Sequence, residues 1–190
     1  MSLYSAAELW QVLQNSGQTR TASINLSESS KSFSGTYDIF LSHSSLDAGT
    51  VAGLKQHIEE TMGFSVYVYW INDPALTRAI SEENARTIKS RMEVCTSLIY
   101  AFSENSYQSK WMPWELGYFD GKKNRVAILP ITTEHNQLNS YHGQEYLGLY
   151  PYITKGLSSN NNKETLWVYE NENTYINFRS WLSGIDPLKR

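Results

Sequence analysis

The sequence predicts a single α/β domain built on a parallel β-sheet. Short apolar runs alternate along the chain with segments in which apolar residues recur every three or four positions, the pattern of strands alternating with helices. The chain has 190 residues, of which 41% are hydrophobic, which suits one sizeable core and does not favour a second full domain. These two observations indicate one globular domain with short appendages.

The N-terminal part of the chain is expected to lie apart from this domain. Residues 6–13 can form a short helix with one apolar side, whereas residues 16–35 are rich in Ser and Thr and poor in apolar residues, as in a linker. We therefore divide the chain into an N-terminal helix and linker over residues 1–35 and a folded domain over residues 36–190.

Five strands are predicted in the domain. They are the apolar runs 37–42, 64–70, 96–102, 125–131 and 165–169. Capping residues at Asp47 and Ser81 indicate two helix starts, and a third helix over residues 109–121 ends at a glycine. Residues 132–162 show no periodicity and are expected to form a long connection, and residues 175–182 a closing helix.

These elements predict a flavodoxin-like three-layer fold with a five-stranded parallel sheet in the order 2-1-3-4-5. In such a sheet the ligand crevice lies where strands 1 and 3 part. Two segments meet there, residues 42–47 after the first strand and residues 103–115 after the third. Neither carries the glycine-rich phosphate loop of a dehydrogenase or a P-loop enzyme, and the acidic residues of a phospho-receiver domain are absent from both strand ends.

Composition excludes further classes of function. A formal net charge of -3 leaves no basic excess for a phosphate backbone, so we expect no nucleic-acid partner. No apolar run approaches the roughly 20 residues that span a bilayer, and no signal segment is recognisable, so we expect a cytoplasmic protein that does not contact a membrane. The single cysteine, Cys95, and the scattered histidines predict no metal site, and Cys95 is expected to be a buried structural thiol.

Three motifs carry a family resemblance. The segment YDIFLSHSSLD, Tyr37 to Asp47, resembles the first conserved box of Toll/interleukin-1 receptor (TIR) domains. The segment SKWMPWELGYFDG resembles their third-helix region, with its W-x-x-x-E signature from Trp111 to Glu115. Between them, WINDPALTR, Trp70 to Arg78, takes the place of the mobile loop after the second strand, called the BB loop. The resemblance implies an α/β domain that self-associates, either as a signalling scaffold or as an NAD⁺-consuming enzyme.

Glu115 is the predicted catalytic residue. Because nicotinamide leaves NAD⁺ as a neutral base and needs no proton, the two carboxylates of a usual glycosidase can reduce to one that stabilises the oxocarbenium-like ribose. Glu115 lies four residues after Trp111, on the same helix face and near the predicted crevice. Without the resemblance, the favoured interpretation is a carboxylate that only stabilises the helix start through the helix dipole.

The first box and the helix motif supply the predicted substrate contacts. Ser42, His43 and Ser44 can donate hydrogen bonds to ribose or diphosphate oxygens, beside a helix N-terminus that favours anions. Trp111 can stack on a nucleotide ring or pack in the core. Asp47 is expected first to cap the following helix.

The BB loop is expected to join subunits. Asp73 and Arg78 are predicted either to order the loop over the nucleotide or to contact a neighbouring subunit. The loop mixes apolar and charged residues, as interfaces do. We therefore expect self-association through the stretch from Trp70 to Arg78, with other TIR domains as further candidate partners.

The sequence thus favours an NAD⁺ nucleosidase of the TIR family that takes NAD⁺ as its substrate, needs no cofactor or metal and acts in defence signalling. It would release nicotinamide and either ADP-ribose or a cyclic ADP-ribose isomer, and the chain does not decide between these products. The alternative is a non-enzymatic TIR adaptor or host-directed effector that acts through TIR–TIR contacts. A third interpretation is another glycosidic-bond enzyme on a similar sheet, such as a nucleoside deoxyribosyltransferase.

Overall fold

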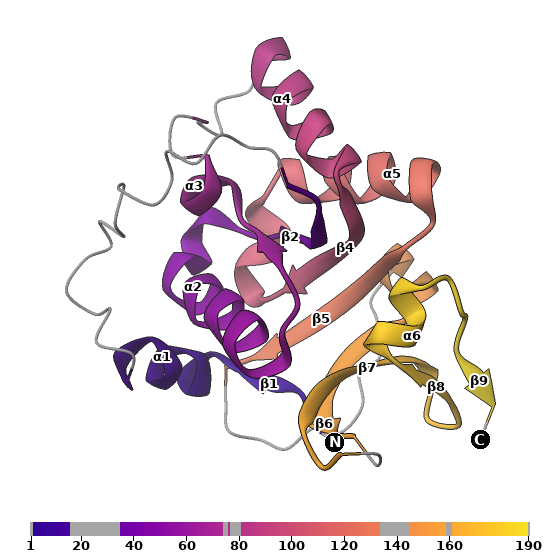
Figure 1. Cartoon of the computed structure of the whole chain (residues 1–190). Coiled ribbons are helices and arrows are strands. Elements are labelled where there is room, and N and C mark those ends of the chain that lie inside the picture. Colours follow the sequence, from indigo (N-terminus) through magenta and orange to yellow (C-terminus); the bar gives the residue numbers. More distant parts are fainter. Residues whose placement is uncertain are drawn as a thin grey trace.

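A mixed β-sheet lies between two layers of helices (Figure 1). This computed structural model describes residues 2–15, 35–73, 76, 81–133, 145–158 and 161–189. The nine strands in this part of the chain are β1 (Tyr4–Ser5), β2 (Tyr37–Ser42), β3 (Val66–Tyr67), β4 (Cys95–Phe102), β5 (Val126–Thr132), β6 (Tyr152–Leu157), β7 (Glu164–Asn171), β8 (Thr174–Asn177) and β9 (Leu188–Lys189). The α-helices are α1 (Ala6–Asn15), α2 (Ala48–His57), α3 (Tyr69–Asn72), α4 (Glu82–Glu93), α5 (Trp111–Lys123) and α6 (Phe178–Leu182).

The centre of the sheet is parallel. Strands β3, β2, β4 and β5 lie side by side in that order and run in the same direction. Strands β4 and β5 are almost continuously buried apolar runs, which is typical of central parallel strands covered on both faces. This arrangement confirms the predicted α/β class and the predicted order of the first four strands.

The other half of the sheet differs from the prediction. Strand β6 lies next to β5 and pairs with it in parallel, whereas β7, β8 and β9 follow as antiparallel strands. The apolar run 165–169 is therefore part of β7, and the prediction of a purely parallel five-stranded sheet is wrong. Residues 158–163 between β6 and β7 are too few for a parallel crossover, which needs about a dozen residues or more. The start of the predicted closing helix is strand β8, and only its end forms α6.

Alternation along β2 sends its side chains into two different cores. Ile39 and Leu41 pack with α1, α2 and α6 in one cluster, whereas Phe40 packs with α4 and α5 in the other. By the same alternation, Ser42 at the end of the strand lies on the side of α5. Among the described residues, the helices are all too short or too polar to cross a membrane.

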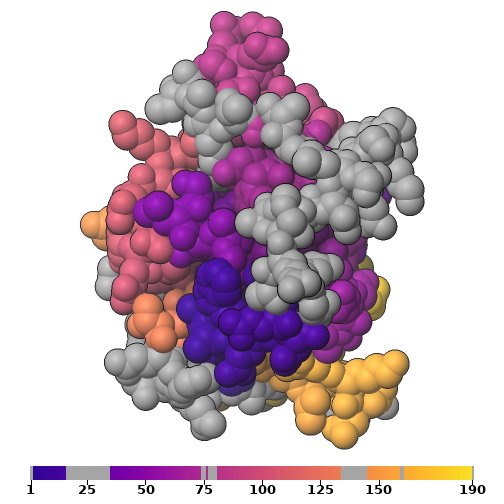
Figure 2. Space-filling model, turned by 90° about the vertical axis from the view of Figure 1, so that its left-hand side faces the viewer, coloured from indigo at the N-terminus to yellow at the C-terminus, as the bar shows by residue number. Residues whose placement is uncertain are grey.

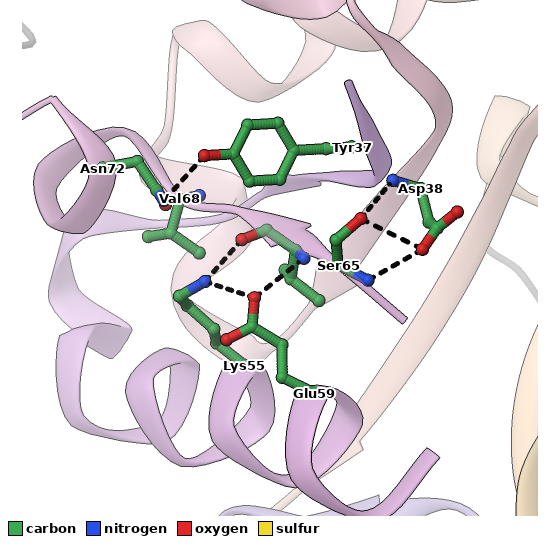
Figure 3. Close-up of polar contacts among 8 residues, drawn as sticks. Tyr37, Asp38, Lys55, Glu59, Ser65, Val68 and Asn72 are labelled. Carbon is green, nitrogen blue, oxygen red and sulfur yellow. Dashed lines mark hydrogen bonds and ion pairs between the residues drawn. The ribbon is translucent and has the colours of Figure 1, made fainter. Parts of the chain in front are cut away.

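Strand β3 is a two-residue edge strand, and side chains form hydrogen bonds with the backbone groups on its free edge (Figure 3). The backbone N–H of Val66 donates to Glu59 at 3.0 Å, and its carbonyl oxygen accepts from Lys55 at 2.6 Å, at positions where a further strand would otherwise bond. Toward β2, Asp38 accepts from the backbone N–H and the hydroxyl of Ser65 at 2.8 and 3.0 Å. These contacts hold the strand from which α3 and the BB loop continue.

The N-terminal segment is packed into the domain. Strand β1 pairs with β5, and Ser2 exchanges backbone hydrogen bonds with Lys155 of β6. Helix α1 lies against α2, where a side-chain carbon at Gly53 would stand only 2.1 Å from the carbonyl oxygen of Leu9. Figure 2 shows this segment, in indigo, against the purple region that includes α2. The helix is thus part of the core, and residues 16–34, which carry the predicted linker, lie outside the described residues.

Candidate active site

Glu115 and Ser42 meet at the carboxyl end of β2. The Ser42 hydroxyl donates to Glu115 Oε2 at 2.5 Å, although the two residues are 73 positions apart in the sequence. Ser42 is fully buried and Glu115 is 1% exposed. The strand alternation described above places Ser42 on the side of α5, and Glu115 lies in the second turn of that helix. The two motifs quoted from the sequence are therefore in direct contact.

The burial of Glu115 has a chemical consequence. Glutamate is almost never fully buried unless a partner compensates for lost hydration, because an isolated charge in the interior is costly. A hydrogen bond from a hydroxyl to an ionised carboxylate is short and strong, which fits the distance to Ser42. Because Glu115 is 1% exposed, its carboxylate has almost no contact with solvent in this structure.

His43 links the first box to the start of the BB loop. Its Nδ1 lies 2.7 Å from the carbonyl oxygen of Leu41, and its Nε2 accepts from the indole N–H of Trp70 at 3.1 Å. A carbonyl accepts but does not donate, so this arrangement assigns the proton to Nδ1 and makes the ring neutral. The ring also stacks on Tyr69 at 5.2 Å and is fully buried. The predicted donation from His43 to a substrate oxygen has no support here, since both ring nitrogens bind within the protein.

Asp47 joins the two segments that border the predicted crevice. The structure confirms Asp47 at the N-cap position of α2, but its side chain makes no capping hydrogen bond. Its carboxylate instead accepts from the Ser103 hydroxyl at 2.5 Å and from the Asn105 side-chain amide at 2.6 Å. Both partners follow β4, so the carboxylate joins the segment after β2 to the segment after β4. Ser44 caps the preceding 3-10 helix Ser45–Asp47, and its hydroxyl accepts from the backbone N–H of Leu46 at 3.3 Å.

Asp73 anchors the start of the BB loop on its own subunit. Its two carboxylate oxygens accept from Arg91 of α4 at 2.6 and 3.1 Å, and one of them also accepts from the Tyr67 hydroxyl at 2.8 Å. Burial, with the hydrogen bond to Asp73, raises the pKa of Tyr67 well above its usual value, so Tyr67 stays a donor. Arg78, the other predicted loop residue, lies outside the described residues.

Trp111 stands at the first position of α5 and is half-buried. Its ring meets Trp114 edge to face, with ring centroids 5.2 Å apart, and Trp114 stacks on Tyr118 at 6.0 Å. Lys89 of α4 lies over the Trp114 and Tyr118 rings at 5.7 and 5.2 Å. Trp111 is therefore held at one end of an aromatic row, and one turn of helix separates it from Glu115.

Comparisons with known proteins identify the family. The chain is 54% identical over 147 residues to the probable 3′ cyclic ADP-D-ribose synthase ThsB′ of Bacillus cereus (strain MSX-D12), covering 77% of this chain and 75% of that protein. The chain belongs to the bacterial TIR-domain family of cyclic ADP-D-ribose synthases. It is also 27% identical over 84 residues to the putative cyclic ADP-D-ribose synthase TIR2 of Cytobacillus dafuensis, over 43% of this chain and 22% of that protein. No family model matches the chain.

Membership in this TIR family confirms the resemblance drawn from the three motifs. Two features in or beside the site were nevertheless missed from the sequence. One is Arg91, whose partner Asp73 is 18 positions away on another element. The other is a pocket of about 150 Å³ between the end of β4, the start of α5 and residues 145–147. These last residues fall in the stretch without periodicity, so no pattern could place them near the site.

Proposed function

We propose that this protein converts NAD⁺ into nicotinamide and a cyclic ADP-D-ribose, with the 3′ isomer as the main product. The observation that carries the proposal is the buried pair of Ser42 and Glu115, formed by the two motifs of the TIR family. Its relative ThsB′ of Bacillus cereus is named a probable 3′ cyclic ADP-D-ribose synthase, and the high identity supports the same product here.

The proposed reaction needs one carboxylate. The bond between the nicotinamide nitrogen and the ribose carbon breaks, and nicotinamide takes the electron pair and leaves neutral. Glu115 stabilises the cationic ribose carbon by its charge. The 3′ hydroxyl of the adenosine ribose then bonds to that carbon, and its proton passes to Glu115 or to water. Cyclisation competes with hydrolysis, so the internal hydroxyl is favoured when the bound substrate keeps bulk water away from the ribose carbon.

Other site residues receive supporting roles. Ser42 fixes the orientation of the Glu115 carboxylate, and Trp111 is retained as the candidate that stacks on a ring of the substrate. Ser44 is kept as a candidate donor to substrate oxygens, since it opens the turn before α2. We assign His43 to positioning, because it holds Trp70 and thereby the chain entering the BB loop.

We further propose that self-association through Trp70 to Arg78 raises activity, as expected for a TIR domain. The anchoring of Asp73 by Arg91 supports a loop whose base is fixed on its own subunit while its tip meets a neighbour. Specific activity measured over a wide dilution series is expected to rise with protein concentration. Constant specific activity from a protein that stays monomeric by light scattering would contradict this part of the proposal.

The test of the reaction is product analysis. Purified protein is incubated with NAD⁺, and the products are separated by chromatography against linear ADP-ribose and the cyclic isomers. The amount of nicotinamide is expected to equal the sum of cyclic and linear ADP-ribose, with the cyclic form as the main product. Linear ADP-ribose as the only product would overturn the cyclase assignment, and intact NAD⁺ at every protein concentration would overturn the enzyme assignment.

A further inference from the structure

The pocket beside the start of α5 is a second candidate binding site. Its volume is about 150 Å³, and it lies between β4, the 3-10 helix Glu104–Gln108, the first turn of α5 and the 3-10 helix Glu145–Leu149. Glu115 is not among the residues that line it. The segment between β4 and Glu115 therefore lines this pocket and also leads directly to the residue that contacts Ser42.

Four aromatic side chains line the pocket: Tyr100, Phe102, Tyr107 and Tyr146. Tyr100 is 3% exposed, whereas Tyr107 and Tyr146 are 64% and 41% exposed. Phe102 meets Tyr107 edge to face, with ring centroids 5.6 Å apart and planes at 82°. This contact places the exposed Tyr107 ring at the mouth of the pocket, where a tyrosine offers a large stacking surface at a low cost in side-chain entropy.

The size and polarity of the pocket define its ligand. Sites for drug-sized ligands occupy about 300–1,000 Å³, so a pocket of about 150 Å³ takes one flat ring system rather than a whole dinucleotide. Glu145 is the charged residue in the lining. A carboxylate accepts N–H donors and repels phosphate. A flat heteroaromatic ring that carries an amino group meets these conditions, with any phosphates directed to solvent.

We propose that this pocket binds the adenine ring of an adenine nucleotide. Adenine offers a flat face on which a tyrosine ring of the lining can stack and an exocyclic amine for Glu145. The choice of adenine rests on the proposed function, because NAD⁺ and cyclic ADP-ribose both carry this base. The bound nucleotide is either the NAD⁺ being converted or a second molecule, such as the product, and occupancy fixes the segment that carries Glu115.

Binding of adenosine tests the proposal without any turnover. Titration calorimetry on the full chain compares wild type with Tyr107→Ala, Tyr107→Phe and Leu149→Ala. Leu149 is 82% exposed and does not line the pocket, so it controls for surface truncation near the site. The Tyr107→Ala variant is expected to bind adenosine at least about fivefold more weakly, because base stacking is lost, while Tyr107→Phe and Leu149→Ala bind as wild type does. Nicotinamide riboside, which lacks adenine, is expected to bind more weakly than adenosine.

Kinetics then separate the two sources of the base. If the pocket holds the adenine of the substrate, Tyr107→Ala raises the KM for NAD⁺ and leaves kcat unchanged. If the pocket holds a second nucleotide, Tyr107→Ala leaves the KM for NAD⁺ unchanged. In that case added adenosine changes the rate of NAD⁺ cleavage by wild type but not by the variant. No adenosine binding by wild type at millimolar concentration, or equal affinity in Tyr107→Ala, would overturn the proposal. A protein that binds adenosine through Tyr107 but never cleaves NAD⁺ would refute the proposed function alone.

Discussion

The Asp47 carboxylate accepts a hydrogen bond from the Ser103 hydroxyl at 2.5 Å and thereby ties the segment after β2 to the segment after β4. The two strands are neighbours in the sheet, and the segments that follow them border the predicted crevice. Ser42 precedes the first connection, and Glu115 follows the second. Asp47 is therefore placed to set the distance between the two halves of the candidate site.

Loss of this connection is expected to lower both stability and turnover. Asp47→Ala removes the acceptor of two side-chain hydrogen bonds, which predicts a loss of about 1–3 kcal/mol in the free energy of unfolding. Turnover is expected to fall by about tenfold or more at temperatures where the variant is folded, because the two segments are no longer held together. The measurements are denaturant unfolding and NAD⁺ consumption.

Asp186→Ala is the matched control for Asp47→Ala. It also removes a carboxylate bound to another element, through Arg125 at 2.7 Å, but the Asp186 side chain is 75% exposed. An exposed ion pair contributes about 0–1 kcal/mol, so this variant should resemble wild type in both assays. Equal turnover in the Asp47 and Asp186 variants would show that Asp47 has no special role at the site.

A second prediction tests whether α1 belongs to the folded domain. In Gly53→Ala the added carbon would stand 2.1 Å from the Leu9 carbonyl oxygen, so α1 must move away from α2. Overpacking of this kind costs about 1–3 kcal/mol. Gly121→Ala is the control, because nothing lies within 4 Å of its added carbon and alanine favours a helix by about 1 kcal/mol. Chemical denaturation should show one variant destabilised and the other stabilised. Unchanged stability in Gly53→Ala would place α1 outside the cooperative unit.

Cys95 is expected to react slowly with thiol reagents in the native protein. It is 1% exposed, and burial raises its pKa to about 12, so at pH 8 almost no thiolate forms. An unfolded cysteine has a pKa of about 8.5. As the pH rises above that value, the unfolded chain loses its proton first, so the contribution of Cys95 to folding stability falls. Labelling with iodoacetamide at pH 8 should follow unfolding, and rapid native labelling would contradict a buried thiol.

The sequence predicted the parallel centre of the sheet because an apolar run marks each of its strands, although the run 64–70 is longer than its strand, since β3 covers only Val66–Tyr67 and α3 begins at Tyr69. The prediction failed at β6. Lys155 and Gly156 interrupt the apolar pattern there, and the strand forms through its pairing with β7. The prediction also treated the N-terminal helix as an appendage. The close approach of Leu9 to Gly53 depends on a small residue more than 40 positions away, which local periodicity does not reveal.

The candidate site was only partly accessible to sequence reasoning. The topology rule and the motifs placed Ser42 and Glu115 together, because strand ends in a parallel sheet share one edge. The roles of Asp47 and His43 could not be predicted in the same way. The sequence favours a helix cap for Asp47 and a donor to substrate oxygens for His43, whereas partners distant in sequence, Ser103 and Trp70, bind these side chains in the structure.

The central claim is that the Glu115 carboxylate carries the cleavage of NAD⁺. The most direct test is the turnover of Glu115→Gln, which keeps the shape and the acceptor for Ser42 but removes the charge, with circular dichroism and thermal unfolding to establish that the variant is folded. Loss of charge stabilisation of about 3 kcal/mol predicts at least a hundredfold lower rate of nicotinamide release. A folded Glu115→Gln variant that releases nicotinamide at the wild-type rate would contradict the mechanism.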